Sequence, residues 1–482
     1  MNVSREKVPG VVIAGLRGGS GKTIISLGIT AAWIAQNITV APFKKGPDYI
    51  DAGWLSRAAG RPCYNLDTYL CAQSVVQASY LTHSQSCDIA LIEGNRGLFD
   101  GIDIDGTTST SELAKLLDLP VVLVLDCTKS TRTMAAVLMG CMQFDPGVNI
   151  CGVILNRLAG KRHEGKIRAN IERFCNIPVL GALPKLKQED FPERHMGLVT
   201  SEEHGESDAS LTRARQVALD NIDIDELFRL ATTFKGQGMP VADYARQDAV
   251  PAIHTTENQN PASNNSTVTI GVVRDSAFQF YYPDNIEALE NRGAKIKFIS
   301  PLSQSDIPDV DAIYMGGGFP ETHATQLSTN KVFKENLKTL SRKGLPIYAE
   351  CGGLIFLGES ICLDDVVYPM AGILPLRFGL SKRPQGHGYT EVKVVNENPF
   401  YAIGEVLRGH EFRYSNVISI DYDNTAMAFK MTRGKGIVEK KDGFFKDNTF
   451  GTYTHIHALG STSTSWAPSL IAKARQFKAS RQ

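Results

Sequence analysis

The sequence predicts an α/β protein with two doubly wound domains, and three observations support this expectation. Short β-branched runs alternate with longer helical patterns over most of the 482 residues, as in βαβ units with parallel strands. At roughly 100 to 200 residues per domain, a chain of this length needs two or three hydrophobic cores. Between His254 and Thr267 the chain has no Val, Ile, Leu, Met or aromatic residue, which is typical of a linker.

Each domain is expected to contain a series of buried parallel strands. Those of the first domain are Val11–Ala14, Val40–Phe43, Ile89–Ile92, Val121–Leu125 and Gly152–Leu155. Those of the second are Val268–Val273, Lys295–Ile299, Ala312–Met315 and Pro346–Ala349. The domains are expected at residues 1–235 and 267–482, with the linker at residues 236–266. Because ligands of such folds bind at the carboxyl ends of strands, the residues that follow these runs are the candidates for function.

Composition narrows the class of ligand. The 51 Lys and Arg residues balance 51 Asp and Glu residues, so no overall field favours nucleic acid or an anionic membrane. No apolar stretch approaches the roughly 18 residues of a membrane-spanning helix. The nine cysteines include no CxxC pair, and the run Val11–Ala14 is too short for a secretory signal. We therefore expect a cytoplasmic protein with small-molecule ligands, and a homodimer is left open.

A glycine-rich loop follows the first apolar run. Residues 15–23 read GLRGGSGKT, and a helical pattern follows from Ile24 to Gln36. The backbone N–H groups of such a loop bind phosphate oxygens, its lysine reaches the terminal phosphates and its hydroxyl binds Mg²⁺. The strict GxxxxGK[ST] pattern would need glycine in place of Leu16, so this loop is a variant. It predicts an ATP site at Gly19, Gly21, Lys22 and Thr23, and the alternative is a glycine turn without nucleotide.

Polar residues follow the other strands of the first domain. Asp48 and Asp51 come after the second run and Glu93 after the third, so all three are expected at one edge of the sheet. Thr23, Asp48 and Glu93 are the predicted Mg²⁺ ligands, although each acid alone is more often a turn or helix-cap residue. Asn156, after the fifth run, is expected either to contact the ATP base or to form a turn.

A thiol nucleophile is predicted in the second domain. Cys351 comes directly after a strand and before a glycine-led helix, a sharp turn that exposes the sulfur and favours its thiolate form. His455, in GTYTHIH near the end of the chain, is the candidate base, with a structural role as the alternative. Gly317 and Gly318 follow another strand and are candidates for an oxyanion hole or for an ordinary turn.

Seven motifs in a fixed order identify a resemblance that covers almost the whole chain. They are GSGKT, KKGPDYID, EGNRGLFDG, GGGFPE, AECGGL, RGHEFRYS and GTYTHIH. Together they resemble the cobyrinate a,c-diamide synthase family, whose members amidate two acetate side chains of a tetrapyrrole. The resemblance implies an N-terminal P-loop domain similar to dethiobiotin synthetase and a C-terminal class I glutamine amidotransferase domain of flavodoxin-like fold. It also implies that Cys351 is the glutaminase nucleophile and that His455 activates it.

The sequence departs from the expected patterns at three places. Ordinary class I amidotransferases follow this histidine with Pro and Glu, whereas Ile456 and His457 stand here, so no orienting acid is assigned. The phosphate loop has Arg17 ahead of two glycines, and GPDYID is followed by Ala-Gly-Trp at residues 52–54. The last two departures lie in the domain expected to bind the tetrapyrrole, so more than one macrocycle is kept as a candidate substrate.

The resemblance implies a ligase that uses ATP, Mg²⁺ and glutamine to amidate a polyanionic tetrapyrrole. The candidate substrate residues are Lys45, Asp51 and Asp100, and Lys44 and Arg96 are further carboxylate contacts or solvated surface charges. Cobyrinate is the first expected substrate, with sirohaem second and hydrogenobyrinate and nickel-sirohydrochlorin also open. Two other classes of function are weighed: a ParA-like ATP-dependent switch, which leaves Cys351 without a role, and a binding module that sequesters a tetrapyrrole without chemistry.

Overall fold

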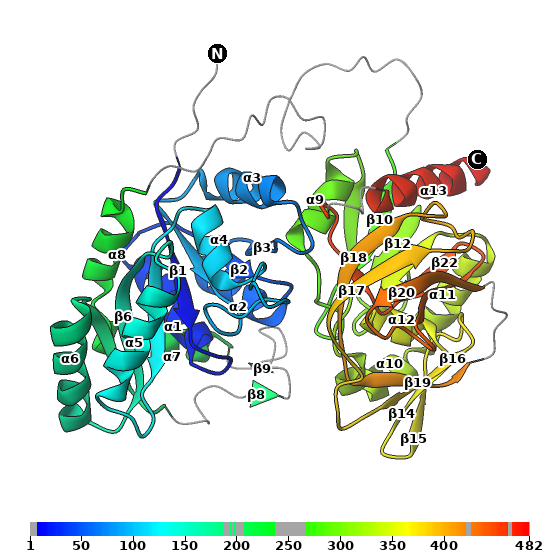
Figure 1. The fold of residues 1–482 in the computed structure, drawn as a ribbon. Coiled ribbons are helices and arrows are strands. Elements are labelled where there is room, and N and C mark those ends of the chain that lie inside the picture. Colours follow the sequence, from blue (N-terminus) through cyan, green and yellow to red (C-terminus); the bar gives the residue numbers. More distant parts are fainter. Residues whose placement is uncertain are drawn as a thin grey trace, which may run out of the picture. The chain divides into compact units, whose positions relative to one another are not determined.

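The computed structural model describes residues 7–186, 193–194, 197–198, 207–236, 267–420, 426–460 and 465–481. The chain divides into two compact units, Met1–Asp248 and Ala249–Gln482, each built around its own sheet (Figure 1). The predicted fold class, two α/β domains, is confirmed. Apart from Gly236, the predicted linker at residues 236–266 lies outside the described residues, so the domain bounds stay a prediction.

The first unit has a seven-stranded parallel sheet in the order β3-β2-β4-β1-β5-β6-β7. Its strands are β1 (Gly10–Gly15), β2 (Val40–Lys45), β3 (Tyr64–Leu66), β4 (Ile89–Glu93), β5 (Val121–Asp126), β6 (Ile150–Leu158) and β7 (Val179–Pro184). Its helices are α1 (Lys22–Ala35), α2 (Ile50–Ala59), α3 (Gln73–Ser84), α4 (Thr110–Leu116), α5 (Thr133–Phe144), α6 (Lys161–Cys175), α7 (Ser207–Asn221) and α8 (Ile224–Thr233). A separate pair joins β8 (Glu193–Arg194) and β9 (Gly197–Leu198).

Local sequence explains these elements. β1 lies at the centre of the sheet and is buried on both faces, which is why it reads as an uninterrupted apolar run. α4 begins where the Ser109 hydroxyl accepts a hydrogen bond from the backbone of Glu112, and α8 begins at Asp223 in the same way. Because crossovers between parallel strands are right-handed, α1 and α2 pack on one face of the sheet, and α3 to α6 pack on the other (Figure 1).

The second unit has a ten-stranded sheet in the order β11-β10-β12-β13-β22-β21-β20-β17-β18-β23. Its parallel half contains β10 (Thr269–Val273), β11 (Lys295–Ile299), β12 (Ala312–Met315), β13 (Ile347–Glu350) and β22 (Thr449–Thr452). Its antiparallel half contains β17 (Gly386–Val394), β18 (Val406–Arg413), β20 (Met427–Arg433), β21 (Lys441–Lys446) and β23 (His455–Ile456). The sequence predicted four strands of the parallel half and none of the antiparallel half.

Two cores lie on the two faces of this sheet. Along β12, Ala312 and Tyr314 pack into one core, whereas Ile313 and Met315 pack into the other, as the alternation of side chains in a strand requires. The helices are α9 (Pro283–Glu290), α10 (Ala324–Thr329), α11 (Lys331–Arg342), α12 (Gly352–Leu357) and α13 (Trp466–Ser480), with a 3-10 turn at Pro320–His323. A smaller sheet joins β14 (Ser360–Leu363), β15 (Val366–Pro369), β16 (Leu376–Leu380) and β19 (Ser415–Ile420).

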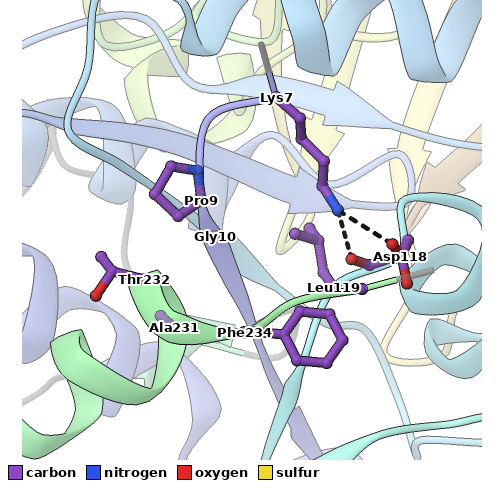
Figure 2. A pocket seen from close by; sticks show the side chains of 9 residues that line it. Lys7, Pro9, Gly10, Asp118, Leu119, Ala231, Thr232 and Phe234 are labelled. Carbon is purple, nitrogen blue, oxygen red and sulfur yellow. Dashed lines mark hydrogen bonds and ion pairs between the residues drawn. The ribbon is translucent and has the colours of Figure 1, made fainter. Parts of the chain in front are cut away.

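A cavity of about 240 Å³ lies at the amino ends of β1 and β5 in the first unit (Figure 2). Gly10 begins β1, Leu119 precedes β5, and the Lys7 ammonium pairs with Asp118 beside them, 3.8 Å from its carboxylate. This edge of the sheet is opposite to the one that carries the glycine-rich loop, so the cavity is separate from the predicted nucleotide site. Within the described ranges, no helix is both long and apolar enough to cross a membrane.

Candidate active sites

The glycine-rich loop joins β1 to α1 in the geometry of a phosphate-binding loop. Gly19 and Gly21 have φ angles of 70° and 93°, a left-handed conformation that favours glycine. A Cβ atom on Gly21 would lie 2.3 Å from Nδ2 of Asn156, which donates a hydrogen bond to the carbonyl of Ser20 at 2.9 Å. The amide of Asn156 thus supports the loop from β6, and its predicted contact with the ATP base stays a prediction.

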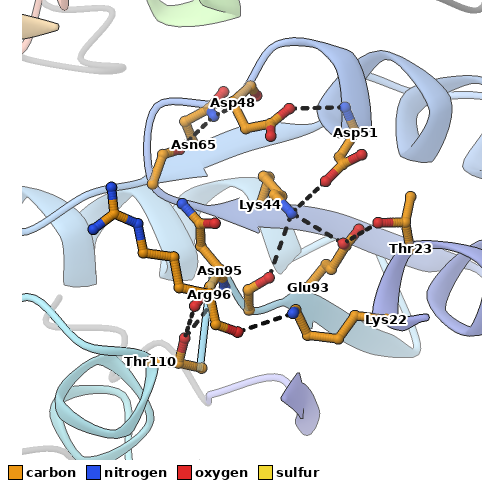
Figure 3. Close-up of polar contacts among 12 residues, drawn as sticks. Lys22, Thr23, Lys44, Asp48, Asp51, Asn65, Glu93, Asn95, Arg96 and Thr110 are labelled. Carbon is orange, nitrogen blue, oxygen red and sulfur yellow. Dashed lines mark hydrogen bonds and ion pairs between the residues drawn. The ribbon is translucent and has the colours of Figure 1, made fainter. Parts of the chain in front are cut away.

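Lys22 is buried at the start of α1. Its ammonium donates a hydrogen bond of 3.1 Å to the carbonyl of Arg17. It donates a second, of 2.9 Å, to the carbonyl of Arg96 (Figure 3). Burial lowers the pKa of Lys22, and the positive charge of Lys44 lowers it further. The ammonium therefore lies beside the loop backbone. Phosphate oxygens carry a negative charge, which these neutral carbonyls lack, and would therefore bind the ammonium more strongly.

Thr23 and Glu93 come together at the edge of the sheet. The threonine hydroxyl donates a hydrogen bond of 2.7 Å to Oε1 of Glu93, which is fully buried (Figure 3). Its Oε2 atom has no hydrogen-bond partner among the described residues. Burial raises the pKa of Glu93 to about 7. A hydroxyl beside a carboxylate with an unused oxygen suits a hard cation, so these two predicted ligands fit Mg²⁺.

Asp48 has a different set of contacts. Its Oδ1 atom accepts a hydrogen bond from the backbone of Asp51 at 2.9 Å, at the beginning of α2 (Figure 3). Burial, and then the nearby Asp51 carboxylate, raise the pKa of Asp48 to about 6. These contacts are those of a helix-start residue, the alternative that the sequence left open. The role of Asp48 as a metal ligand stays a prediction.

Lys44 is a buried cation between two acids. Its ammonium lies 2.7 Å from Asp51 and 3.0 Å from Glu93, and the side chain is 2% exposed (Figure 3). Burial opposes its charge, but the carboxylates of Asp51 and Glu93 outweigh burial and raise the pKa of Lys44. Opposite register positions on β2 and β4 bring Lys44 and Glu93 together. The sequence left Lys44 as either a substrate carboxylate contact or a solvated surface charge. Its burial rules out the second, and its pairing with Glu93 was missed because only the strand order reveals it.

The other predicted substrate residues lie around the same edge. Lys45 is buried, and burial lowers its pKa, while the charge of Asp67 acts in the opposite direction. Asp100 is exposed in the loop after β4, where its carboxylate accepts a hydrogen bond of 3.0 Å from the backbone of Gly97. Their roles toward a substrate stay predictions. Sequence reasoning also missed Asp126 at the end of β5, which pairs with Arg17 and Arg157 at 2.8 Å each.

In the second unit, Cys351 stands at a sharp turn between β13 and α12. Its φ and ψ angles are 47° and −97°, a combination that costs a residue with a side chain of order 1–3 kcal/mol. The backbone N–H of Cys351 donates to the carbonyl of Thr452 at 2.7 Å, which holds the turn against β22. The loop after β12 comes so close that a Cβ atom on Gly352 would lie 2.9 Å from the backbone nitrogen of Gly318.

The structure brings His455 to this turn. His455 is 1% exposed on β23 and shares a side-chain hydrogen bond with Cys351. Its Nδ1 atom lies 3.4 Å from Oε2 of Glu350. Burial opposes the imidazolium charge, but the hydrogen bonds to Cys351 and Glu350 prevail and raise the pKa of His455 to about 10. The group next to the thiol is therefore a protonated imidazole over the physiological pH range.

Gly317 and Gly318 lie against the same pair. A Cβ atom on Gly317 would lie 2.5 Å from Cε1 of His455, and one on Gly318 would lie 2.1 Å from the carbonyl oxygen of Ala277. The carbonyl of Gly317 accepts a hydrogen bond from Phe280 at 3.0 Å, which fixes the course of the loop. Both glycines are thus held in place by contacts that a larger residue would break, Gly317 against His455 and Gly318 against Ala277, and their role as oxyanion donors stays a prediction.

Two further histidines are buried beside His455. His410, its register partner on β18, stacks on it with ring centroids 4.9 Å apart. Burial, and then the charges of His455 and His457, lower the pKa of His410 well below its ordinary value, so this ring is neutral. His457 lies 3.3 Å from the carboxylate of Asp284 on α9. Sequence reasoning placed no role on His410, although it stands in the motif RGHEFRYS.

Comparison with known proteins agrees with both units. Residues 11–199 match the family described as "CobQ/CobB/MinD/ParA nucleotide binding domain", and residues 269–463 match "CobB/CobQ-like glutamine amidotransferase domain". Among solved structures, that of PurLQS from Thermotoga maritima has a TM-score of 0.33 at 15% identity, covering 44% of this chain and 100% of that one. A score this low carries no functional information.

Several curated relatives match the chain over nearly its whole length. The cobyrinate a,c-diamide synthase of Magnetococcus marinus is 39% identical over 464 residues, covering 96% of this chain and 97% of that one. The enzyme of the same name from Archaeoglobus fulgidus is 36% identical over 457 residues, with 95% and 96% covered. That from Salmonella typhimurium is 36% identical over 451 residues, with 92% and 94% covered.

A buried cysteine–histidine pair in one unit and a phosphate-binding loop in the other define a glutamine-dependent amidotransferase with a nucleotide-binding domain. Such an enzyme is a ligase that forms carbon–nitrogen bonds with glutamine as the nitrogen donor. The chain belongs to the cobyrinate a,c-diamide synthase family. The expectation drawn from the seven motifs is confirmed, and the ParA-like switch and the non-catalytic binding module are no longer needed to explain the sequence.

Proposed function

We propose that the chain amidates the a- and c-acetate carboxylates of cobyrinate in cobalamin biosynthesis, using ATP and glutamine. The observation that carries the proposal is the 39% identity to the Magnetococcus marinus enzyme over 96% of this chain. The two sites fit the two half-reactions of such an amidation, which are release of ammonia from glutamine and activation of a carboxylate. Activation is needed because a carboxylate has no good leaving group of its own.

In the thiol site, Cys351 is the nucleophile that attacks the side-chain amide of glutamine. The oxyanion that develops accepts hydrogen bonds from the backbone of Gly317 and Gly318, and His455 gives a proton to the departing ammonia. A γ-glutamyl thioester on Cys351 results. Water then attacks this thioester and His455 takes a proton from the water. The C–S bond breaks, glutamate leaves, and Cys351 is restored as a thiolate beside protonated His455.

In the nucleotide site, the loop backbone and Lys22 bind and orient the phosphates of ATP. Thr23 and Glu93 would hold Mg²⁺, with Asp48 as a third candidate, and the ion would supply neutralisation of phosphate charge. A substrate carboxylate attacks the γ-phosphate to give an acyl phosphate and ADP, and ammonia then displaces phosphate to form the amide. Lys45, Asp51 and Asp100 are the candidate contacts for the tetrapyrrole.

The substrate is tested by incubating the purified protein with ATP, glutamine and one macrocycle at a time. Each amidation replaces a hydroxyl by an amino group and removes one negative charge near neutral pH, so mass spectrometry and anion-exchange chromatography both count the steps. Two steps on cobyrinate are expected. Faster conversion of sirohaem, hydrogenobyrinate or nickel-sirohydrochlorin than of cobyrinate would contradict the proposed substrate.

The proposal also covers the metal requirement, the cellular location and the oligomeric state of the protein. The Mg²⁺ requirement is tested by chelation and by titration of the ion into the amidation assay, where activity is expected to return with the metal. A cytoplasmic location follows from the chemistry of ATP and glutamine supply. A homodimer is compatible with the proposal, and light scattering on the purified protein measures the oligomeric state.

A further inference from the structure

We propose that Glu350 is the positioning carboxylate of the thiol site, which holds His455 through Nδ1 and leaves Nε2 for Cys351. This inference rests on the proposed glutaminase role of Cys351 and extends it to the residue directly before the nucleophile. Glu350 is 1% exposed, and its Oε2 atom lies 3.4 Å from Nδ1 of His455. A carboxylate in this position fixes the orientation and the tautomer of the imidazole and stabilises its protonated form.

Glu350 is itself held by three donors. Its Oε1 atom accepts a hydrogen bond from the backbone N–H of Ile456 at 3.2 Å and lies 3.5 Å from the hydroxyl of Tyr348. Its Oε2 atom accepts from the hydroxyl of Tyr314 at 3.3 Å. Because Ile456 follows His455 in the chain, one carboxylate fixes both the ring of the histidine and the strand that carries it.

The two tyrosines that donate to Glu350 lie on adjacent strands in the same core. Tyr314 and Tyr348 are register partners on β12 and β13, and both are fully buried in the same core. Burial raises the pKa of each hydroxyl well above its ordinary value, and the charge of Glu350 adds to the effect. Both hydroxyls therefore stay protonated and able to donate across the working pH range. The carboxylate is preorganised before any ligand enters.

The second histidine–carboxylate pair of the region does not compete for this role. His457 lies 3.3 Å from Asp284, and its side chain contacts the ring of Tyr282, with centroids 4.6 Å apart. The groups that face His455 are Cys351, Glu350 and the neutral ring of His410, with Gly317 against the edge of the ring. Glu350 is thus the negative charge that reaches Nδ1, from the end of β13.

The test compares Glu350→Gln with the unmodified chain in two assays. With glutamine as nitrogen donor, kcat is expected to fall about 10²-fold while KM for glutamine changes little, because positioning acts on the chemical step. With ammonium salts as donor, amidation is expected to be unchanged. Glu350→Asp, which keeps the charge, is expected to recover part of the lost glutaminase activity.

The pH profile separates positioning from packing. Without the negative charge of Glu350, the pKa of His455 falls, so the alkaline limb of kcat/KM for glutamate release is expected to move to lower pH by about one unit or more. Asp284→Asn removes the same charge from the His457 pair and serves as the matched control. Its profile is expected to keep the alkaline limb of the unmodified chain.

Three results would overturn the proposal. They are full glutaminase activity with an unshifted profile in Glu350→Gln, an equal loss of activity with ammonium salts, and the same loss and shift in Asp284→Asn. Failure of the proposed function gives a different result. In that case Cys351→Ser would still release glutamate from glutamine, and the thiol would not be the nucleophile at all.

Discussion

At the scale of single residues, both sites contain close contacts that are possible only because one of the two residues is a glycine. Gly317 leaves room for the ring of His455, and Gly21 leaves room for the amide of Asn156. In the first unit, Lys44 places a buried ammonium between Asp51 and Glu93. A change at one of these positions therefore alters the geometry of its neighbours before it alters the chemistry.

Gly317→Ala is expected to reduce glutamine-dependent activity about 10²-fold. The new Cβ atom would lie 2.5 Å from Cε1 of His455, so the ring must shift from its position, and a misplacement of about 1 Å costs this much. Steady-state kinetics of glutamate release measure the effect. Gly140→Ala, at a helical glycine with open space around it, is the control and should keep full activity.

Lys44→Met is expected to destabilise the protein by about 3–5 kcal/mol, because it leaves the buried Glu93 carboxylate and the partly buried Asp51 carboxylate without their cation. Urea denaturation measures the change in the free energy of unfolding. Lys115 offers a matched control, since it also pairs with two acids, Glu112 and Asp145, at 2.7 Å each but is 32% exposed. Lys115→Met should cost no more than about 1 kcal/mol. Equal losses in the two variants would contradict the assigned role of Lys44.

At the scale of elements, the carboxyl edge of β1, β2, β4, β5 and β6 gathers the nucleotide site, whereas the end of β13 and the short strand β23 form the thiol site. Strand order decides both arrangements. β2 and β4 are neighbours although β3 lies between them in sequence, and β23 pairs with β18 rather than with β22. Each site therefore collects residues that are far apart in the chain.

The edge of β2 and β4 makes stability depend on pH. Burial raises the pKa of Glu93 to about 7 and that of Asp48 to about 6, so the folded chain holds protons that the unfolded chain has released. Stability from these groups is present below about pH 4.5 and is lost as the pH rises toward 7. Glu93→Gln is expected to reduce this fall in the free energy of unfolding by roughly 2–3 kcal/mol.

Urea denaturation at a series of pH values from 4.5 to 7.5 measures this effect. Glu226→Gln, at a partly exposed carboxylate that pairs with Arg229 on one helix, is the control. The Arg229 contacts lower the pKa of Glu226, so its titration is complete before this window begins, and the variant should keep the original slope. An unchanged slope in Glu93→Gln would mean that another group is responsible.

The sequence predicts the parts of this molecule that local patterns determine. The runs that became β1, β2, β4, β5 and β6 are buried on both faces, and continuous apolar stretches reveal such strands. The turns at Gly21 and Cys351 have local signatures as well. The antiparallel half of the second sheet escaped prediction because its strands are partly exposed and alternate irregularly. Contacts such as Lys44 with Glu93, and Glu350 with His455, depend on strand order, which no local pattern states.

At the scale of the whole molecule, the two units divide the chemistry between two sets of residues. Each unit has its own sheet and its own buried apolar residues. In the proposed mechanism, each unit also contains the functional groups of one half-reaction. In that mechanism, glutamine hydrolysis uses none of the nucleotide-site residues, and carboxylate activation uses none of the thiol-site residues. The two activities should therefore be separable by single substitutions in the intact chain.

Lys22→Ala and Cys351→Ser are expected to give opposite results. Lys22→Ala should release glutamate from glutamine yet form no amide with either nitrogen donor, since it would lose the cation that we propose binds the phosphates. Cys351→Ser should release no glutamate yet form amide when ammonium salts are supplied. Assays for glutamate, phosphate and amidated tetrapyrrole measure all three outcomes. Amide formation by Lys22→Ala would contradict the assignment of the nucleotide site.

Glu350 is the last residue of β13, and Cys351 is the first residue of the turn that follows it, so one peptide bond joins the two. The carboxylate of Glu350 and the sulfur of Cys351 are therefore carried by the same end of β13. The imidazole that contacts both belongs to His455, more than a hundred residues further along the chain. Any drift of the end of β13 carries both partners together. The covalent backbone thus limits the distance between the acid and the nucleophile, and only the histidine depends on folding to reach the other two residues.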